Sequence, residues 1–153
     1  VMGCDIHIYT EYRNPGELAW QSADTTSVEE EGTKDEYIDV NHAINTSRNY
    51  GLFGLITGVR AEYEQSLECK YAWPDDATET STYQKDRWDS NGHSHSWLVL
   101  DEIKTHLMHL ALTQHDAPNW AIQAYTQLKD EIEELKPSGA SDHDVRILFF
   151  FDN

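Results

Sequence analysis

The chain has 153 residues, the size of one ordinary domain, and 39% of them are hydrophobic, more than a disordered chain usually carries. Its 28 acidic and 11 basic residues give a formal net charge of −17. Such a surface repels nucleic-acid phosphates and anionic lipids, which argues against nonspecific nucleic-acid binding and membrane attachment. Two cysteines are too few for a disulfide scaffold. We therefore expect a single domain, residues 1–153, whose charge keeps it soluble.

The opening of the chain, VMGCDIHIYTEYR, has no basic segment followed by an apolar run, so a signal peptide is not expected. The longest apolar stretches fall far short of the roughly 18 residues that a bilayer requires. These two features predict a cytoplasmic protein without a membrane segment. They leave open whether the protein forms a homo-oligomer.

Two segments near the ends of the chain have strand patterns. Residues 4–12 alternate between an isoleucine face and a polar face that carries Asp5, His7 and Glu11. Residues 145–151, VRILFFF, form an apolar run typical of a strand buried on both faces. We expect these two strands to pair at the centre of one small sheet.

The middle of the chain mixes turn signals with helical spacing. Residues 13–35 contain turn residues and an acidic run, which predict a surface hairpin or loop. Residues 49–64 place apolar side chains at helical spacing, and Gly54 and Gly58 share one side of that helix, which favours close packing of another element there. Residues 70–97 lack periodicity and predict a long irregular loop.

Two helices are expected after this loop. Apolar residues recur at helical spacing in 99–114 and again after Asp116 and Pro118, which suit the N-terminal end of a helix. The two helices would form an antiparallel pair on the sheet. The expected fold is therefore α+β: a single domain with a small central sheet, containing the N- and C-terminal strands, packed against about three helices.

The strongest candidates for chemistry are potential metal ligands. On a strand, residues two apart point the same way, so Asp5 and His7 would project together. His93 and His95, in a Gly/Ser/Asn-rich loop, and Asp152 could complete a mixed nitrogen and oxygen set. We expect this set to bind a divalent transition metal, with Zn or Mn favoured. The alternatives are a solvated strand face and a polar loop that happens to contain histidines.

Four further residues complete the expected site. Arg48 and Arg60 lie beside the glycine-rich helix and can grip a phosphate or carboxylate, although salt bridges to the many acidic residues explain them equally well. Asp89 or Glu11 could serve as the general base.

Four blocks of the sequence resemble a known family: MGCDIHIYTEYR, RNYGLFGLITGVR, HSHSWL and the closing FFFDN. They are similar to small proteins encoded in bacteriophage genomes and prophages, which open with Met-Gly-Cys-Asp-Ile-His. The resemblance covers both ends of the chain and two internal blocks. It implies a phage origin and expression in the cytoplasm of a bacterial host, and it implies no particular activity.

These features favour a metal-dependent hydrolase for a small phosphorylated or nucleotide-like substrate, acting as a phage accessory or anti-defence protein. The metal would lower the pKa of a bound water, and an arginine would neutralise the substrate anion. One alternative is a non-catalytic protein that sequesters a host signalling nucleotide or blocks a host defence protein. Another is an acidic DNA mimic that occupies a basic host protein.

Overall fold

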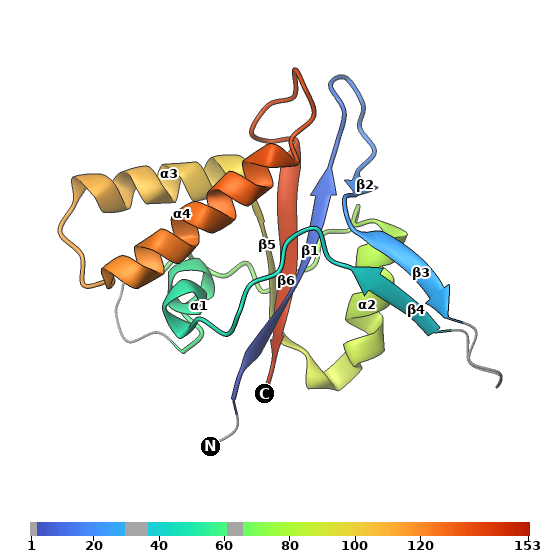
Figure 1. Cartoon of the computed structure of the whole chain (residues 1–153), viewed down its shortest axis with the longest axis horizontal. Helices are drawn as coiled ribbons and strands as arrows, with labels where there is room; N and C mark the ends of the chain where they lie inside the picture. The colour runs from blue at the N-terminus through green and yellow to red at the C-terminus, as the bar shows by residue number, and fades with distance from the viewer. Residues whose placement is uncertain (1–2, 30–36, 61–65) are drawn as a thin grey trace.

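A four-stranded antiparallel sheet forms the centre of the molecule (Figure 1). The computed structural model describes residues 3–29, 37–60 and 66–153. In spatial order the strands are β2 (Gln21–Ser22), β1 (Asp5–Tyr12), β6 (Val145–Asp152) and β5 (His93–Val99). Asp5 pairs with Asp152 and Tyr12 with Val145, so the prediction that the first and last strands pair at the centre is confirmed.

The central strand β6 is covered on both faces, as its apolar sequence predicts. Phe149 and Phe151 face a core built with three helices, α1 (Tyr50–Thr57), α3 (Leu100–Leu112) and α4 (Asn119–Glu134). Phe150 points to the opposite face, which lies under α2 (Glu79–Trp88) and contacts Trp73 and Trp88. Removal of this apolar surface from water is the main force that holds the layers together.

The antiparallel pair α3 and α4 packs on the sheet as predicted. The inward stripe of α4 is fully buried and consists of Ala121, Tyr125, Leu128 and Ile132. Helix α4 begins one residue after Pro118, which occupies the N-cap position expected for Asp116. The α+β class and the small central sheet are confirmed, and the described residues form four helices instead of about three.

Helix α1 is shorter than the expected 49–64. It ends at Thr57, where Gly58 adopts a left-handed conformation (φ 80°) and donates its N–H to Gly54 O at 3.0 Å. Gly58 is therefore a helix cap. The close approach occurs at Gly51, where a Cβ would lie 2.5 Å from the ring of Trp120. Residues 61–65 of the predicted helix lie outside the described residues.

The expected irregular loop at 70–97 is wrong for much of its length. It contains α2, a short 3₁₀ turn at Asp89–Asn91 and strand β5. Helix α2 escapes detection because its buried residues, Ser81 and Gln84, are polar and produce no apolar period. Thr78 caps this helix by accepting a hydrogen bond from Ser81 N at 3.3 Å.

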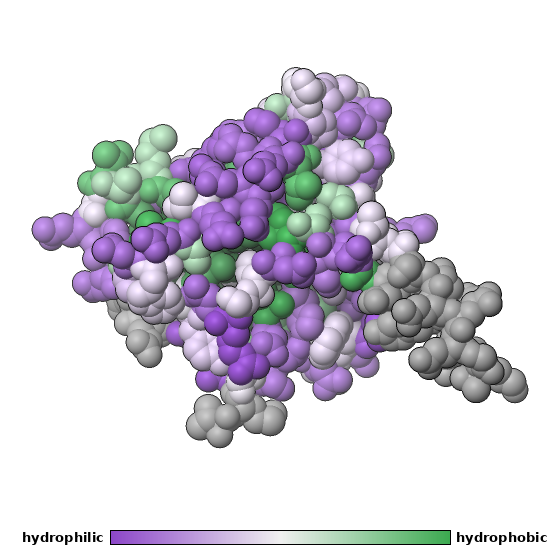
Figure 2. Space-filling model, in the orientation of Figure 1, coloured by the Kyte–Doolittle hydropathy of each residue, from purple (hydrophilic) through white to green (hydrophobic). Residues whose placement is uncertain are grey.

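A second, two-stranded sheet of β3 (Thr25–Glu29) and β4 (Tyr37–Asn41) lies beside α2. The face seen in Figure 2 is largely hydrophilic, with a hydrophobic area over the C-terminal end of α3. Met108 and Leu112 of α3 are 64% and 79% exposed. None of the helices in the described ranges is long and apolar enough to span a bilayer.

Candidate functional site

Two of the expected site residues form an ion pair with each other. Asp5 Oδ1 and Oδ2 accept hydrogen bonds from Arg48 Nε and Nη2 at 2.9 and 3.0 Å. These bonds hold the pKa of Asp5 below its ordinary value. Both side chains are about half exposed, at 51% and 48%. The pair matches the alternative of an ordinary salt bridge for Arg48.

The two histidines of the His-Ser-His block point to opposite faces of the sheet. Next to Ser94 (φ 56°), β5 carries one residue more than the facing stretch of β6, which is a β-bulge. The ring of His93 therefore stacks on Phe151, on the side of the helical core, and its Nε2 lies 3.1 Å from the side chain of the last residue. His95 contacts Phe150 on the α2 side.

The expected metal ligands are not gathered around one point. His7 Nε2 hydrogen-bonds to Asp152 Oδ2, so these two side chains do meet. His7 and His95 lie on the strands that flank β6, and their ring centroids are 5.0 and 5.2 Å from that of Phe150. Within residues 3–29, 37–60 and 66–153, no three His, Cys, Asp or Glu side chains are placed to hold a metal ion. The Zn or Mn centre stays a prediction.

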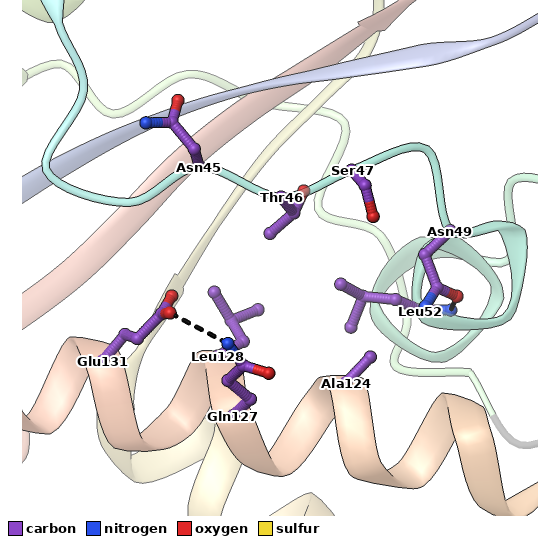
Figure 3. Close-up of a pocket in the computed structure, with 9 residues that line it drawn as sticks. All are labelled: Asn45, Thr46, Ser47, Asn49, Leu52, Ala124, Gln127, Leu128 and Glu131. Atoms are coloured by element: carbon purple, nitrogen blue, oxygen red, sulfur yellow. Dashed lines mark hydrogen bonds between the residues drawn. The ribbon is translucent and has the colours of Figure 1, made fainter.

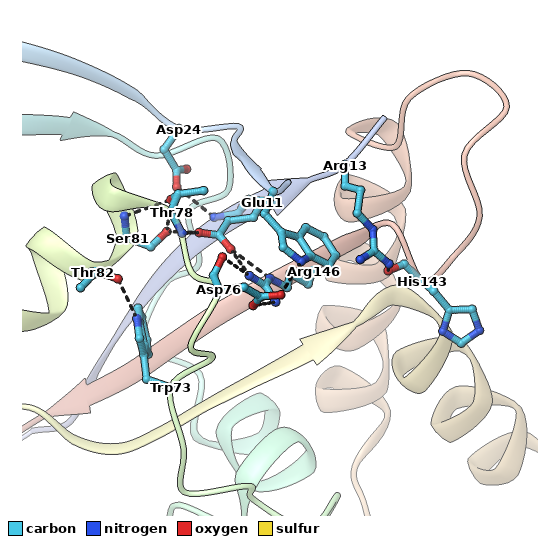
Figure 4. Close-up of polar contacts among 12 residues, drawn as sticks. Glu11, Arg13, Asp24, Trp73, Asp76, Thr78, Ser81, Thr82, His143 and Arg146 are labelled. Carbon is cyan, nitrogen blue, oxygen red and sulfur yellow. Dashed lines mark hydrogen bonds and ion pairs between the residues drawn. The ribbon is translucent and has the colours of Figure 1, made fainter. Parts of the chain in front are cut away.

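Glu11 has a structural role in place of the expected role of general base. It is fully buried, and its Oε1 accepts hydrogen bonds from Arg146 Nη2 and Nε at 2.7 and 2.9 Å (Figure 4). Its Oε2 accepts from Thr78 N and Ser81 Oγ, both at 2.8 Å. With both oxygens engaged inside the protein, Glu11 cannot reach a substrate proton, and it fixes the start of α2 to the sheet.

The remaining two expected residues are Asp89 and Arg60. Asp89 ends α2 with φ 45° and lines a hollow that also includes His95. Burial is the main cause that lowers the pKa of His95. Arg60 lies beside α1, with its guanidinium carbon 5.4 Å from the ring centroid of Tyr50.

The best candidate site is a hollow of about 410 Å³ between β1, β4 and α2, which we call the His7 hollow. Its lining consists of two histidines, one arginine, two amides and three apolar or aromatic side chains: His7, His42, Arg87, Gln84, Asn91, Tyr9, Val40 and Trp88. The ring of His7 packs against those of Trp88 and Phe150, with centroids 4.3 and 5.0 Å away. These contacts fix the orientation of His7 at the wall of the hollow.

Each histidine of the His7 hollow has one ring nitrogen held by the protein. His7 uses Nε2 with the carboxylate of Asp152. His42 Nδ1 lies 2.7 Å from the backbone oxygen of Ile8. Because a carbonyl only accepts hydrogen bonds, Nδ1 of His42 carries a proton, which leaves Nε2 as the nitrogen able to gain or lose one. Partners of this kind set the tautomer and the ring orientation of a histidine.

The lining of the His7 hollow contains no carboxylate, although the chain as a whole carries a charge of −17. Four other hollows on the described part of the molecule each include at least one Asp or Glu. Figure 3 shows one of them, between the Asn45–Asn49 segment and α4, where Gln127 donates to Glu131 at 3.2 Å. Of these five hollows, the lining of the His7 hollow is therefore the one best suited to an anion.

Tyr9 adds a hydrogen-bond donor to this hollow. Burial is the main cause that raises the pKa of its phenol, so the group stays protonated at neutral pH. Tyr9, His42 and Arg87 were not selected from the sequence as site residues. His42 follows β4 with no motif around it. Arg87 could have been noticed as one of only five arginines in an acidic chain.

No protein-family model, curated protein or solved structure matches this chain.

Proposed function

We propose that the protein is a hydrolase for a small phosphorylated or nucleotide-like substrate, and that the His7 hollow is its active site. The observation that carries the proposal is a hollow without carboxylates, lined by two histidines and an arginine, in a chain of net charge −17. The guanidinium, imidazole and amide groups of this lining can donate hydrogen bonds to an anionic ligand. Two imidazoles in one hollow supply a general base and a general acid.

In this proposal His7 is the base and His42 the acid. The Asp152 carboxylate holds the Nε2–H of His7, so Nδ1 takes the proton of the attacking water as its oxygen bonds to phosphorus. The phosphorus–oxygen bond to the leaving group then breaks, and Nε2 of protonated His42 gives its proton to the departing oxygen. Arg87 and the phenol of Tyr9 would bind the phosphate oxygens, since both are hydrogen-bond donors that line the hollow.

The expected metal has no assigned step in this scheme. His7 and His42 both have the second hydrogen bond that metal-ligating histidines usually make. Catalytic zinc normally uses three protein ligands, and these two histidines supply two. Elemental analysis of the purified protein, and assays with added Zn²⁺ or Mn²⁺ and with EDTA, test the metal prediction independently.

The proposal is tested with bis(p-nitrophenyl) phosphate and p-nitrophenyl phosphate, whose release of nitrophenol is followed by absorbance. Replacing His7 or His42 by Gln should lower kcat by about 10²–10⁴-fold, the usual contribution of a general acid or base. His109→Gln, on the exposed side of α3, is the matched control and should leave kcat unchanged. Wild-type protein should show a bell-shaped dependence of kcat/KM on pH.

Three results would decide against catalysis in the His7 hollow. If neither ester is hydrolysed and neither binds, the proposal fails. If His109→Gln lowers the rate as much as His7→Gln, the activity does not arise in this hollow. If a nucleotide binds there and is recovered intact after the protein is denatured, the protein sequesters its ligand, which is the non-catalytic alternative.

A further inference from the structure

A second hollow, of about 690 Å³, lies on the same face of the sheet but shares no residue with the His7 hollow. We call it the indole cleft because two of its walls are Trp20 and Trp97. Val99 and Pro74 add apolar surface to its lining, and Asp75, Asp76 and Glu102 add carboxylates. Unlike the His7 hollow, the indole cleft therefore has carboxylates in its lining, together with Arg13, His143 and Arg146.

The indoles of this cleft already stack with cations of the chain itself. The guanidinium carbon of Arg146 lies 3.9 Å from the Trp20 ring centroid and 5.8 Å from that of Trp97. Lys70 Nζ lies 3.9 Å from the Trp97 centroid, and the guanidinium carbon of Arg13 lies 4.5 Å from that of Trp20. Cations and indoles thus alternate around the cleft in the order Arg13, Trp20, Arg146, Trp97 and Lys70. Such contacts are attractive because the ring face is electron-rich.

Both arginines in the lining are neutralised by carboxylates. Arg13 Nε donates to Asp144 Oδ1 at 2.8 Å. Arg146 donates to Glu11, and its Nη1 donates to Asp76 Oδ1 at 3.0 Å. These guanidinium groups are therefore not available to attract a second anion.

The carboxylates outnumber the cations around the cleft. Glu102 is paired with Lys70 Nζ at 2.8 Å, but the exposed Asp75 has no ion-pair partner in the part of the chain that the structure describes. The lining itself contains three carboxylates and two arginines. The ion-pair partners of these residues add the carboxylates of Asp144 and of the buried Glu11, and the ammonium group of Lys70. Together these groups are five carboxylates and three cations, a net charge of −2. The cleft has an unbalanced negative charge beside two aromatic walls.

We propose that the indole cleft binds an Arg or Lys side chain from a basic segment of a partner protein. The stem of that side chain would lie against Trp97 and Val99, and its charged end would meet Asp75. This is the same cation, indole and carboxylate chemistry that Arg146 already uses inside the protein. The net charge of −17 would speed the encounter with a basic partner and would repel nucleic acids.

The proposal is tested with an acetylated and amidated Gly-Arg-Gly-Arg-Gly peptide and with the same peptide carrying citrulline, the neutral isostere of arginine. Binding is followed by NMR through the five tryptophan indole N–H signals. The arginine peptide should shift the signals of Trp20 and Trp97 and leave Trp120, which is 56% exposed on α4, unchanged. Asp75→Asn should raise Kd about two- to fivefold, the range for one exposed ion pair.

The matched control is Asp130→Asn, which removes the same charge from α4 at a side chain that is 59% exposed. It should leave Kd unchanged. Equal binding of the citrulline peptide would overturn the proposal. So would equal weakening by Asp75→Asn and Asp130→Asn, because that result would show a general attraction to the acidic surface. Neither outcome bears on hydrolysis in the His7 hollow.

Discussion

The buried ion pair between Glu11 and Arg146 should be among the most sensitive points of the fold. Their side chains are 0% and 3% exposed, and Arg146 makes two hydrogen bonds to one carboxylate oxygen. Removing one member of such a pair leaves the other buried charge without its main partner, which costs about 3–5 kcal/mol; among the described carboxylates, only the exposed Asp76, 3.0 Å from Arg146 Nη1, would stay beside Arg146. We therefore expect Glu11→Gln and Arg146→Met each to lower the free energy of unfolding by about this amount.

The double variant should cost less than the sum of the two single variants. It removes both charges together, and the amide oxygen of the new Gln side chain can still accept from Thr78 N and Ser81 Oγ, which now bond to Glu11. We expect a coupling energy of at least about 2 kcal/mol, within the range for residues in one network. The measurement is urea unfolding followed by circular dichroism, analysed as a double-mutant cycle.

The chain supplies its own control in the pair of Asp5 and Arg48. This pair is also held by two hydrogen bonds, but its side chains are 51% and 48% exposed. Asp5→Asn and Arg48→Met should each have a much smaller effect than the variants of the buried pair, because water screens the exposed pair. If a single variant of the buried pair does not fold, folding of the double variant gives the same answer. Equal effects at both pairs, or simple additivity at the buried pair, would refute the reasoning.

Two further predictions concern packing and pH. Gly51→Ala should lower the free energy of unfolding by about 1–3 kcal/mol, because the new Cβ would lie 2.7 Å from the Cβ of Ala121, which cannot rotate away. The measurement is thermal unfolding, and an unchanged or higher Tm would contradict the prediction. Hydrogen bonds and charges from Lys136 and Lys104 lower the pKa of Asp142 in the folded protein. The ionised carboxylate therefore stabilises the fold fully above pH 3.8, the ordinary pKa of aspartate. This contribution is lost as the pH falls through the lower pKa of the folded state. Asp142→Asn should therefore cost about 1 kcal/mol or less at pH 7 and progressively less in acid, as followed by urea unfolding at a series of pH values; a cost that does not fall with pH would argue against it.

The parts of the fold that sequence predicted well are those with a regular apolar period. Strands β1 and β6 and helix α4 bury one clear face or both, so periodicity located them. Helix α2 was missed because it attaches to the sheet through Ser81 and Gln84 and through the buried Glu11, and polar contacts leave no such period. The bulge beside Ser94 also has no sequence pattern, yet it decides which way the neighbouring histidines point.

The residues of the candidate site also divide into those that sequence periodicity could place and those that it could not. His7 and Asp152 could be predicted to meet because both lie on strands whose pairing follows from their sequences. His42 and Arg87 could not, since they come from segments whose position depends on tertiary contacts. The network around Glu11 places α2, and α2 in turn brings Arg87 to the hollow. Residues that look functional in sequence, such as Glu11, are here used to position others.

The pairing of the first and last strands has a consequence for how the protein folds. His7 contacts Asp152, which is 145 residues away along the chain. During synthesis β1 and β5 leave the ribosome long before β6, which pairs with both of them. Only local units such as the α3 and α4 pair can form early, while the edges of β1 and β5 stay open to wrong partners. Assembly of the sheet therefore waits for the final strand, and folding should be slow for a chain of this length.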